Sequence, residues 1–525
     1  MIGLNLHALP SWQRHALAAL TGLALAFAFP NAGIAGLAWI APALLLAAVG
    51  GTNGGRTFWL AWTAGFASAL VQLNWLLCIP VTGFPILGWA ALSAYCALFT
   101  ATWVYLVSSF EFRVSGWSGR TAFALFGAAA WVALEFLRGH FLTGFPWNPL
   151  GASQFKLTPL LQVAAFTGVH GVSFLVVWAS LALFNAVRAV VRHPTRRLAW
   201  QQEIILPLVV VLAAFTLGLL KLREPQPAEK TLRVAAVQPA IPQTMIWDAR
   251  ENTNRFNQLI ALSETAATNC DVLIWPEAAL PELNETTFAA IRELARRHRV
   301  WMIFGADDVE PSSDPAHTRG YEVFNAAFLL TPSGQVQAIY RKHDLVIFGE
   351  YIPLVRWLPF LKFLSPIGEG FSAGDGPVPF ELPLPDAKIT IAPLICFEDV
   401  FAATARRATT DDTDLLLNLT NDGWFGQRAA QWQQAAAASF RAVENGVPLL
   451  RSCNTGLTCW IDARGRVREF FRDQAGTIYG AGVFTTLIPL PARTETFYHR
   501  HGDWFAWSCA VAAALAFIVA RRRVK

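Results

Sequence analysis

Eight apolar stretches in this chain approach the length that a helix needs to cross a lipid bilayer. They lie near residues 14–30, 33–50, 57–79, 83–108, 121–138, 166–187, 203–220 and 503–520. A transmembrane helix takes about 20 mostly apolar residues, because the hydrocarbon core is about 30 Å thick. Charged residues make up only 15% of the chain, against roughly 25% in ordinary soluble domains. The pattern predicts a multi-pass α-helical membrane domain of eight helices.

The first stretch also resembles a secretory signal peptide, because the basic Arg14 precedes its apolar run. It ends in FAFPNAGIAGL, which has no clear small-residue cleavage site, and further apolar stretches follow at once. We therefore interpret it as a transmembrane helix.

The distribution of Lys and Arg indicates the orientation of the predicted helices, since cytoplasmic loops carry an excess of these residues. The basic residues that gather on one side are Arg14, Arg56, Arg113, Arg120, Arg188, Arg192, Arg196, Arg197 and the run at 521–523. The opposite loops carry little positive charge apart from Arg138 and Lys156. We expect both termini to be cytoplasmic and the long segment between the seventh and eighth stretches to lie outside.

Three parts of the chain follow from this topology. Residues 1–224 are predicted to form a membrane domain with seven transmembrane helices, residues 225–492 an extracytoplasmic globular domain, and residues 493–525 the last helix with a basic cytoplasmic tail. The formal net charge of +5 is small for 525 residues, and the basic residues lie beside apolar runs and form no stripe. Nucleic-acid binding is therefore not expected.

The globular segment has the pattern of an α/β fold. Its strand-like runs are LRVAAVQ, DVLIWPE, VWMIFGA, NAAFLLT, KITIAPLICFE, DLLLNLTN and PLLRSCN. Several of these are almost unbroken apolar runs, which is typical of strands buried on both faces. The helical patterns between them are ENTNRFNQLIALSETAA, TTFAAIRELARRH and AAQWQQAAAASFRAVENG. We predict helices that cover a β-sheet.

Three chemically complementary side chains stand at or beyond the ends of such runs. Glu277 ends LIWPE, Lys342 lies in YRKHDLVIFGEYIP eight residues before Glu350, and Cys396 lies in APLICFEDVF. Ligands of parallel α/β sheets bind at the carboxyl ends of strands, where a carboxylate, an ammonium and a thiol together suit nucleophilic attack on a carbonyl. The ammonium is expected to lower the pKa of the thiol. Taken singly, the cysteine suits a buried core and the two charged residues suit a solvated surface.

The other cysteines of the globular segment give no clear site. They are Cys270, Cys453 and Cys459, and no CxxC pair occurs, so a zinc site is not expected. A disulfide between Cys453 and Cys459 is open, because the sequence alone does not define pairing.

The motifs WPE, RKHDLVIFGEYIP and LICFED resemble the Glu-Lys-Cys signature of the nitrilase, or carbon–nitrogen hydrolase, superfamily. With seven predicted helices before them and one after, the whole chain resembles the apolipoprotein N-acyltransferase family in particular. The resemblance implies a nitrilase-like α-β-β-α sandwich for residues 225–492, in the periplasm beside a bacterial inner membrane. It also implies transfer of an acyl chain from a membrane phospholipid to the N-terminal α-amine of the diacylglyceryl-cysteine of an apolipoprotein. The reaction would pass through a thioester and need no metal or other cofactor.

The resemblance assigns roles to nine residues. The implied catalytic residues are the base Glu277, the oxyanion-stabilising Lys342 and the nucleophile Cys396. The implied supporting residues are Glu350, Glu398 and Phe397, the last standing where many members have Tyr. The implied substrate-binding residues are Trp247, Trp424 and Phe425. Lys342 is expected to act by its charge in the transition state and not by holding the fold.

Two other functions fit parts of the pattern. A membrane-anchored amidase or nitrilase would use the same Glu-Lys-Cys triad with water as the acceptor. A transporter or receptor would use the external domain only to bind a ligand, but the helices lack intramembrane charges apart from Glu135.

Glu135 itself has two interpretations. An acid inside an apolar run is a functional hypothesis by default, here a contact with an amine headgroup or another amphiphile. Alternatively, Arg138 three residues further on would form an ion pair with it at the helix end. The stretch GFPWNPLG at 144–151 is either an interfacial loop beside the site or a plain connection between helices.

Overall fold

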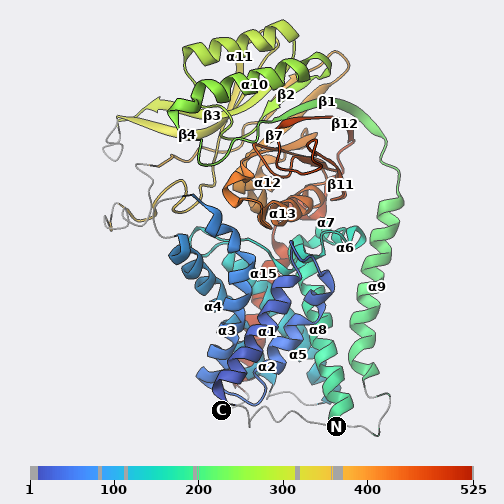
Figure 1. The fold of residues 1–525 in the computed structure, drawn as a ribbon. Coiled ribbons are helices and arrows are strands. Elements are labelled where there is room, and N and C mark those ends of the chain that lie inside the picture. The colour runs from blue at the N-terminus through green and yellow to red at the C-terminus, as the bar shows by residue number, and fades with distance from the viewer. Residues whose placement is uncertain are drawn as a thin grey trace. The chain divides into compact units, whose positions relative to one another are not determined.

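The chain forms two compact units in the computed structural model (Figure 1). The structure describes residues 10–80, 85–111, 116–192, 195, 198, 200–246, 248–313, 320–355, 357–358 and 370–522. The first unit comprises Met1–Leu77, Ile86–Glu224 and Arg500–Lys525, and the second comprises Cys78–Pro85 and Pro225–His499.

The first unit is built from helices. Their bounds are α1 Ser11–Phe27, α2 Ala41–Ala48, α3 Gly54–Gln72, α4 Pro85–Glu111, α5 Gly116–Arg138, α6 Thr158–Leu161, α7 Ala164–Thr167, α8 Val169–Arg192, α9 Gln201–Arg223 and α15 Trp504–Arg522. Short 3₁₀ turns connect several of them, including η2 Ala35–Trp39 and η5 Leu150–Gln154.

Four of these helices are long and apolar enough to cross a membrane among the residues that the structure describes. They are Pro85–Phe110, Gly116–Arg138, Val169–Arg192 and Gln201–Arg223, and Trp504–Val519 is a shorter apolar helix. The predicted count of eight spanning helices is therefore not confirmed.

The prediction of one helix over 33–50 is wrong. The segment folds as η2 followed by the eight-residue helix α2, which has Pro42 in its first turn. A proline lacks a backbone N–H and suits only the first turn of a helix, so the chain starts a new helix there. The N–H of Ala43, exposed by this start, donates to Ser180 Oγ of α8 at 3.0 Å.

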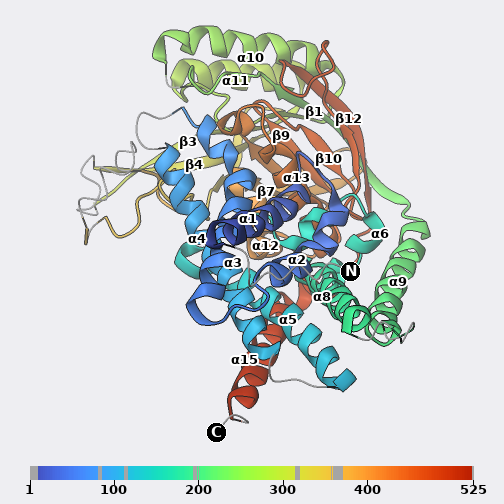
Figure 2. The same cartoon turned by 60° about the horizontal axis from the view of Figure 1, so that its bottom comes forward.

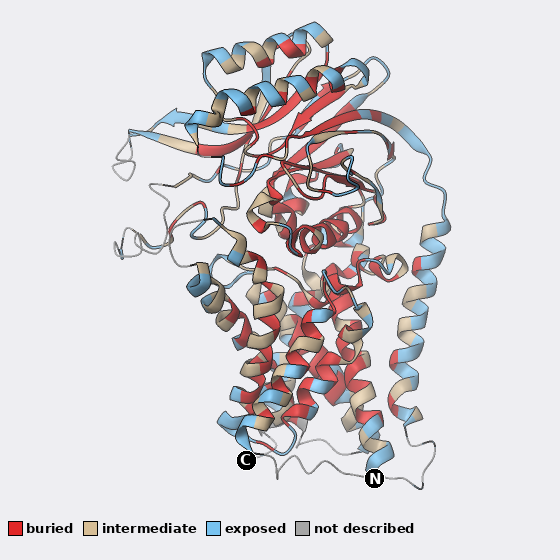
Figure 3. Cartoon of the chain, in the orientation of Figure 1, coloured by how far each residue is buried: buried red, intermediate tan, exposed pale blue. Residues whose placement is uncertain are grey.

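Helix α9 shows how the apolar surface of the first unit is distributed. Only Glu203, Pro207 and Gly218 are buried in it, and Figure 3 shows it mostly pale blue and tan, in contrast to the largely red α8. The exposed side chains of α9 are leucines, valines and isoleucine along most of its length. A soluble helix would expose polar residues on this face, so its composition fits contact with lipid.

The second unit contains two six-stranded sheets. The first has the order β12-β1-β2-β3-β4-β5 and the second the order β11-β10-β9-β8-β7-β6. The strands are β1 Ala228–Gln238, β2 Val272–Trp275, β3 Trp301–Pro311, β4 Tyr321–Leu330, β5 Val336–Arg341, β6 Phe380–Pro383, β7 Lys388–Ile395, β8 Leu415–Thr420, β9 Leu449–Cys453, β10 Cys459–Ile461, β11 Val467–Phe470 and β12 Gly482–Pro491. Strands β1, β2 and β3 run parallel, as do β7, β8 and β9.

Helices cover the outer face of each sheet. Helices α10 (Asn252–Ala266) and α11 (Glu285–His298) pack on the first sheet through one apolar cluster, which includes Leu259, Ile291 and Trp275. Helices α12 (Ala402–Ala408) and α13 (Ala430–Asn445) pack on the second sheet through another. Figures 1 and 2 show α10 and α11 side by side in both views.

The inner faces of the two sheets form a third apolar cluster. It contains Val234, Ile274 and Ile303 of the first sheet and Ile391 and Leu417 of the second, all at most 1% exposed. The second unit is therefore an α-β-β-α sandwich. All seven predicted strands and all three predicted helices of this unit are present. The residue pattern indicated one sheet covered by helices, whereas the strands form two sheets.

Candidate active site

Cys396 stands at the point where strand β7 turns sharply into a 3₁₀ helix. Strand β7 ends at Ile395, and Cys396 begins the 3₁₀ turn η9 (Cys396–Val400) with a backbone φ of 54°. A non-glycine residue is rarely found in this left-handed region, and such strain concentrates at functional sites. The carbonyl of Cys396 accepts hydrogen bonds from Asn418 Nδ2 at 3.1 Å and from Gln434 Nε2 at 2.8 Å. These two amides hold the turn that presents the thiol.

Glu277 lies just beyond strand β2 and is bound through both carboxylate oxygens. Its Oε1 accepts from Asn325 Nδ2 at 2.8 Å, and its Oε2 accepts from the backbone N–H of Asn421 at 3.0 Å. The thiol of Cys396 lies close enough to the same carboxylate to affect its pKa. Burial raises the pKa of Glu277, although the nearby Lys342 ammonium opposes this shift. A carboxylate with a raised pKa that contacts a thiol is placed to accept its proton.

Lys342 follows strand β5 directly and its side chain is 1% exposed. Its Nζ donates to Glu350 Oε1 at 2.8 Å. Asn325 Nδ2 contacts this same oxygen at 3.1 Å as well as Glu277, so one amide connects the two carboxylates. Burial alone would lower the pKa of Lys342, but the carboxylates of Glu350 and Glu277 together raise it. The lysine is therefore a buried, charged ammonium that also neutralises its neighbours, so the expectation that it contributes little to the fold is not supported.

The predicted lowering of the thiol pKa is wrong. Burial raises the pKa of Cys396 well above its usual range, and the negative charge of Glu277 adds to this effect more than Lys342 offsets it. The resting site therefore holds a neutral thiol. Such a thiol becomes nucleophilic when a base removes its proton during attack, which is the chemistry that Glu277 is positioned to perform.

Glu398 joins the end of strand β5 to the turn that carries the cysteine. The hydroxyl of Tyr340 donates to both its oxygens at 2.9 and 2.8 Å, and the N–H groups of His343 and Asp344 donate at 2.8 and 3.1 Å. The N–H of Ile395 donates at 2.8 Å from the other side. Glu398 is completely buried, and burial raises its pKa although Lys342 opposes this. Its contacts are those of a residue that fixes two loops relative to each other.

A second buried charge network was not predicted from the sequence. Asp399 pairs with Arg451 and accepts from Asn418 at 2.5 Å and Gln434 at 2.9 Å. Arg451 also lies 3.2 Å from Asp422. Asn418 and Gln434 are the amides that bind the cysteine carbonyl, so the network holds that turn through these two side chains. The signal in the sequence was the single arginine inside the apolar run PLLRSCN, because a buried charge requires a partner.

The aromatic residues implied as supports or contacts lie in two turns. Phe397 is half-buried, and its ring meets that of Phe401 edge-on at 5.3 Å between centroids. Trp424 is half-buried and Phe425 buried in the 3₁₀ turn η10, Asp422–Phe425. Trp247 lies outside the described residues. Cys453 and Cys459 are both buried and free in this structure.

Within the helical unit, Glu135 is buried near the end of α5, with its side chain 8% exposed. Its Oε1 accepts from Trp131 Nε1 at 2.7 Å and from the N–H of Leu150 at 2.6 Å, and its Oε2 lies 3.8 Å from His170 Nδ1. Glu135 thus holds the 144–151 segment against its helix, a role that neither interpretation of the sequence included. Contact with an amphiphile stays a hypothesis.

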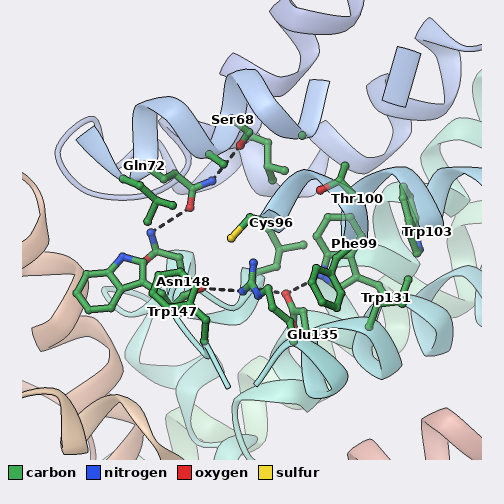
Figure 4. A pocket seen from close by; sticks show the side chains of 18 of the residues that line it. Ser68, Gln72, Cys96, Phe99, Thr100, Trp103, Trp131, Glu135, Trp147 and Asn148 are labelled. Atoms are coloured by element: carbon green, nitrogen blue, oxygen red, sulfur yellow. Dashed lines mark hydrogen bonds between the residues drawn. The ribbon is translucent and has the colours of Figure 1, made fainter. Parts of the chain in front are cut away.

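Arg138, one turn further along α5, holds the same segment and lines a cavity. Its Nη2 donates to the carbonyl of Trp147 at 2.7 Å, so the interpretation as an ion pair with Glu135 is not what these contacts indicate. On the facing side, Asn148 Nδ2 donates to Gln72 Oε1 at 3.0 Å (Figure 4). Polar groups of α3, α4, α5 and the 144–151 segment therefore face a common space inside the helical unit.

Comparison with known sequences agrees with the fold. The family described as "Carbon-nitrogen hydrolase" matches residues 233–483, which contain Glu277, Lys342 and Cys396. The class that the fold and this match define is a membrane protein with a nitrilase-like α/β domain. The family described as "Apolipoprotein N-acyltransferase N-terminal domain" matches residues 21–182, within the helical unit.

Three relatives span most of the chain, and all are named apolipoprotein N-acyltransferase. The relative from Geobacter metallireducens is 36% identical over 97% of this chain and 95% of its own length. That from Bradyrhizobium diazoefficiens is 33% identical over 74% of this chain and 71% of its own length. That from Vibrio vulnificus is 29% identical over 97% and 98%, respectively. The chain belongs to the apolipoprotein N-acyltransferase family. It is a membrane acyltransferase.

Proposed function

We propose that this chain transfers an acyl chain from a membrane phospholipid to the α-amine of the N-terminal diacylglyceryl-cysteine of apolipoproteins. Glu277, Lys342 and Cys396 are the catalytic residues of this proposal. The observation that carries it is the convergence of a buried carboxylate, an ammonium and a thiol on a strained turn, in a chain of this family.

In the first half-reaction, Glu277 accepts the thiol proton as the sulfur of Cys396 attacks the ester carbonyl carbon of the phospholipid. A C–S bond forms and the carbonyl electron pair moves to oxygen, which Lys342 and the N–H of Phe397 stabilise. When the oxyanion collapses, the C–O bond to the glycerol breaks. Glu277 returns its proton to the departing alkoxide, so a lysophospholipid leaves and a thioester remains.

In the second half-reaction, the α-amine of the lipoprotein attacks the thioester carbonyl. Glu277 takes a proton from the attacking nitrogen, the C–N bond forms and the C–S bond breaks. The proton returns to the sulfur and the amide product leaves. The residues described require no metal or cofactor for these steps. Glu350 and Glu398 act here by holding Lys342 and the cysteine turn, and Trp424, Phe425 and Trp247 are proposed to contact the acyl chain.

The proposed location is a bacterial inner membrane that the chain crosses several times, with residues 225–492 in the periplasm. The membrane parts would then be residues 1–224 and 493–525. Both substrates carry acyl chains held in the bilayer, so a membrane-embedded enzyme meets them without extracting either lipid into water. The bias of basic residues toward one side of the predicted helices supports this orientation.

The test is to incubate the purified protein with a phospholipid carrying a labelled acyl chain and no amine acceptor. An acyl mass on the peptide containing LICFED that neutral hydroxylamine removes is the expected result, because hydroxylamine cleaves thioesters. The Cys396→Ala variant should insert in the membrane and carry no acyl mass. Addition of a diacylglyceryl-cysteine peptide should release the label as an amide. Hydrolysis of small soluble amides with no labelling by phospholipid would instead identify a membrane-anchored amidase.

A further inference from the structure

Thr420 stands beside Cys396 at the carboxyl edge of the second sheet. It is the last residue of β8, which runs parallel to β7 with Leu419 opposite Ile395, so the next residues of the two strands are neighbours. The side chain of Thr420 is completely buried. The following N–H, that of Asn421, donates to Glu277 Oε2. The threonine therefore neighbours the proposed nucleophile across the sheet and directly precedes a backbone donor to the proposed base.

The hydroxyl of Thr420 has no well-aligned hydrogen-bond partner among the described residues. It lies close to the Cys396 thiol, and the hydrogen bond that it can donate to that sulfur lowers the pKa of the thiol. Leaving a buried hydroxyl unpaired destabilises a fold, so such a group requires an explanation. If only the shape of the side chain mattered at this strand end, valine would serve better than threonine. Valine fills the same space and has no unpaired donor.

We propose that the Thr420 hydroxyl is a catalytic donor, which forms its hydrogen bond to the Cys396 sulfur when that sulfur carries negative charge. This inference rests on the proposed function, because it requires Cys396 to be the nucleophile. In the resting site the thiol is neutral and a weak acceptor, so the hydroxyl gains little. When Glu277 takes the proton, the sulfur becomes an anion, and hydrogen bonds to charged acceptors are about twice as strong as neutral ones.

The same hydrogen bond acts in both half-reactions. It stabilises the charge that develops on sulfur as the proton leaves before attack on the phospholipid ester. It stabilises the sulfur again when the C–S bond of the thioester breaks and the electron pair returns to sulfur. The proton that Glu277 then delivers restores the thiol. Thr420 gains and loses no atom in the cycle, so the stoichiometry of the two half-reactions is the same with or without this hydrogen bond.

The experiment compares Thr420→Val, which removes the hydroxyl, with Thr420→Ser, which retains it. Iodoacetamide alkylation of the LICFED peptide, followed by mass spectrometry across a pH series, measures how readily the Cys396 sulfur becomes an anion. Labelled phospholipid measures formation of the acyl-enzyme in the same preparations. Thr390→Val is the matched control, since Thr390 is a buried threonine of the neighbouring strand β7, near its opposite end.

Thr420→Val is expected to shift the alkylation profile to higher pH and to slow acyl-enzyme formation by about tenfold or more, the usual effect of losing one hydrogen bond to a charged group. Its melting temperature should equal or exceed that of the wild type, because an unpaired buried hydroxyl is gone. Thr420→Ser should restore most of the rate, and Thr390→Val should leave the alkylation profile in place. If Thr420→Val fails to fold, the contrast between Thr420→Ala and Thr420→Ser gives the same comparison.

Two results would overturn the inference. One is a Thr420→Val protein whose alkylation profile and acyl-enzyme rate match the wild type. The other is a slow Thr420→Ser protein, because the hydroxyl would then be insufficient. Failure of the proposed function is distinguishable, since the wild type itself would then form no acyl-enzyme on Cys396.

Discussion

At the scale of single residues, the site is governed by the balance of buried charge. Glu277, Glu350 and Glu398 are all at most 9% exposed, and Lys342 is the cation whose charge acts on all three. A buried ion pair contributes little net stability when intact, but the loss of one partner leaves an uncompensated charge. Lys342, which is proposed for catalysis, is therefore also needed to stabilise the folded state, because its charge compensates these buried carboxylates.

This balance predicts the behaviour of Lys342→Met. Its turnover should fall by about two orders of magnitude or more, as for loss of an oxyanion donor. Its unfolding free energy should fall by about 3–5 kcal/mol, the usual cost of breaking a buried pair. Adding Glu350→Gln should recover much of the stability and none of the turnover. Thermal unfolding and acyl-transfer assays on the single and double variants would measure this, and a single variant that melts like the wild type would contradict the prediction.

The raised pKa of Glu277 predicts an acid limb in the pH dependence. An ordinary glutamate titrates near pH 4.3, and burial raises the pKa of Glu277 above its usual value. As the pH falls through this raised pKa, the carboxylate becomes protonated and can no longer accept the thiol proton. The initial rate of acyl-enzyme formation should therefore decline on the acid side at a pH above the ordinary range, and recover as the pH rises.

The matched variant is Glu277→Gln, which keeps the shape of the side chain and cannot act as a base. Its rate should be at least about a hundredfold lower and should show no acid limb in the same range. An unchanged acid limb in this variant would assign the titration to another group.

At the scale of elements, Glu398 connects the end of strand β5 to the turn that carries Cys396. It accepts hydrogen bonds from the chain on both sides, at His343 and Asp344 after β5 and at Ile395 before the cysteine. The loop that carries Lys342 and the turn that carries Cys396 are thereby fixed to one carboxylate. Neither loop has to be ordered by the substrate.

This arrangement predicts a large difference between two substitutions. Glu398→Ala leaves several buried donors unpaired at about 1–3 kcal/mol each, so it should melt far below the wild type and lose activity. Tyr340→Phe removes one donor and leaves the carboxylate its backbone partners, so it should cost only about 1–3 kcal/mol. Hydrogen exchange of the 342–344 backbone, together with thermal unfolding, would measure both. Similar unfolding of the two variants would show that Glu398 does not connect the loops.

The elements that the sequence predicts are those with a local signal. Strands β2, β7 and β8 are almost unbroken apolar runs, and the ends of β2 and β7 located Glu277 and Cys396. Strand β5, VQAIYR, has an exposed or half-exposed start and was not predicted, so Lys342 was found only through its motif. The pairing of strands into two sheets is set by contacts between distant segments and leaves no local pattern.

The contacts of the site were harder to predict than its residues. Asn325 was placed correctly in a strand, but its bridge between Glu277 and Glu350 depends on the register of β3, β4 and β5. The pKa of Cys396 was predicted with the wrong sign because the sequence shows the neighbouring charges and not the degree of burial. Burial is the dominant cause of that shift.

At the scale of the whole molecule, the chain combines a helical unit that exposes apolar residues with a unit built around a buried polar site. Helices α4, α5, α8 and α9 have the length and hydropathy to cross a membrane. Residues between α9 and α15 form the whole of the sandwich. Since a polypeptide that crosses the bilayer must place this intervening unit on one side, the orientation decides whether lipoproteins exposed outside the cytoplasm can reach Cys396.

The charge bias predicts that the sandwich lies outside the cytoplasm, and single cysteines introduced at exposed positions can test this. Ser333 lies in an exposed turn between β4 and β5, and Arg56 lies at the exposed start of α3 among the predicted cytoplasmic residues. A membrane-impermeant maleimide added to intact cells with a permeable outer membrane should label Ser333→Cys and not Arg56→Cys. Lysis should expose both, and the parent chain, with its own seven cysteines, gives the background. Protection of Ser333→Cys with labelling of Arg56→Cys would invert the orientation, and the proposed acceptor could then not be a periplasmic lipoprotein.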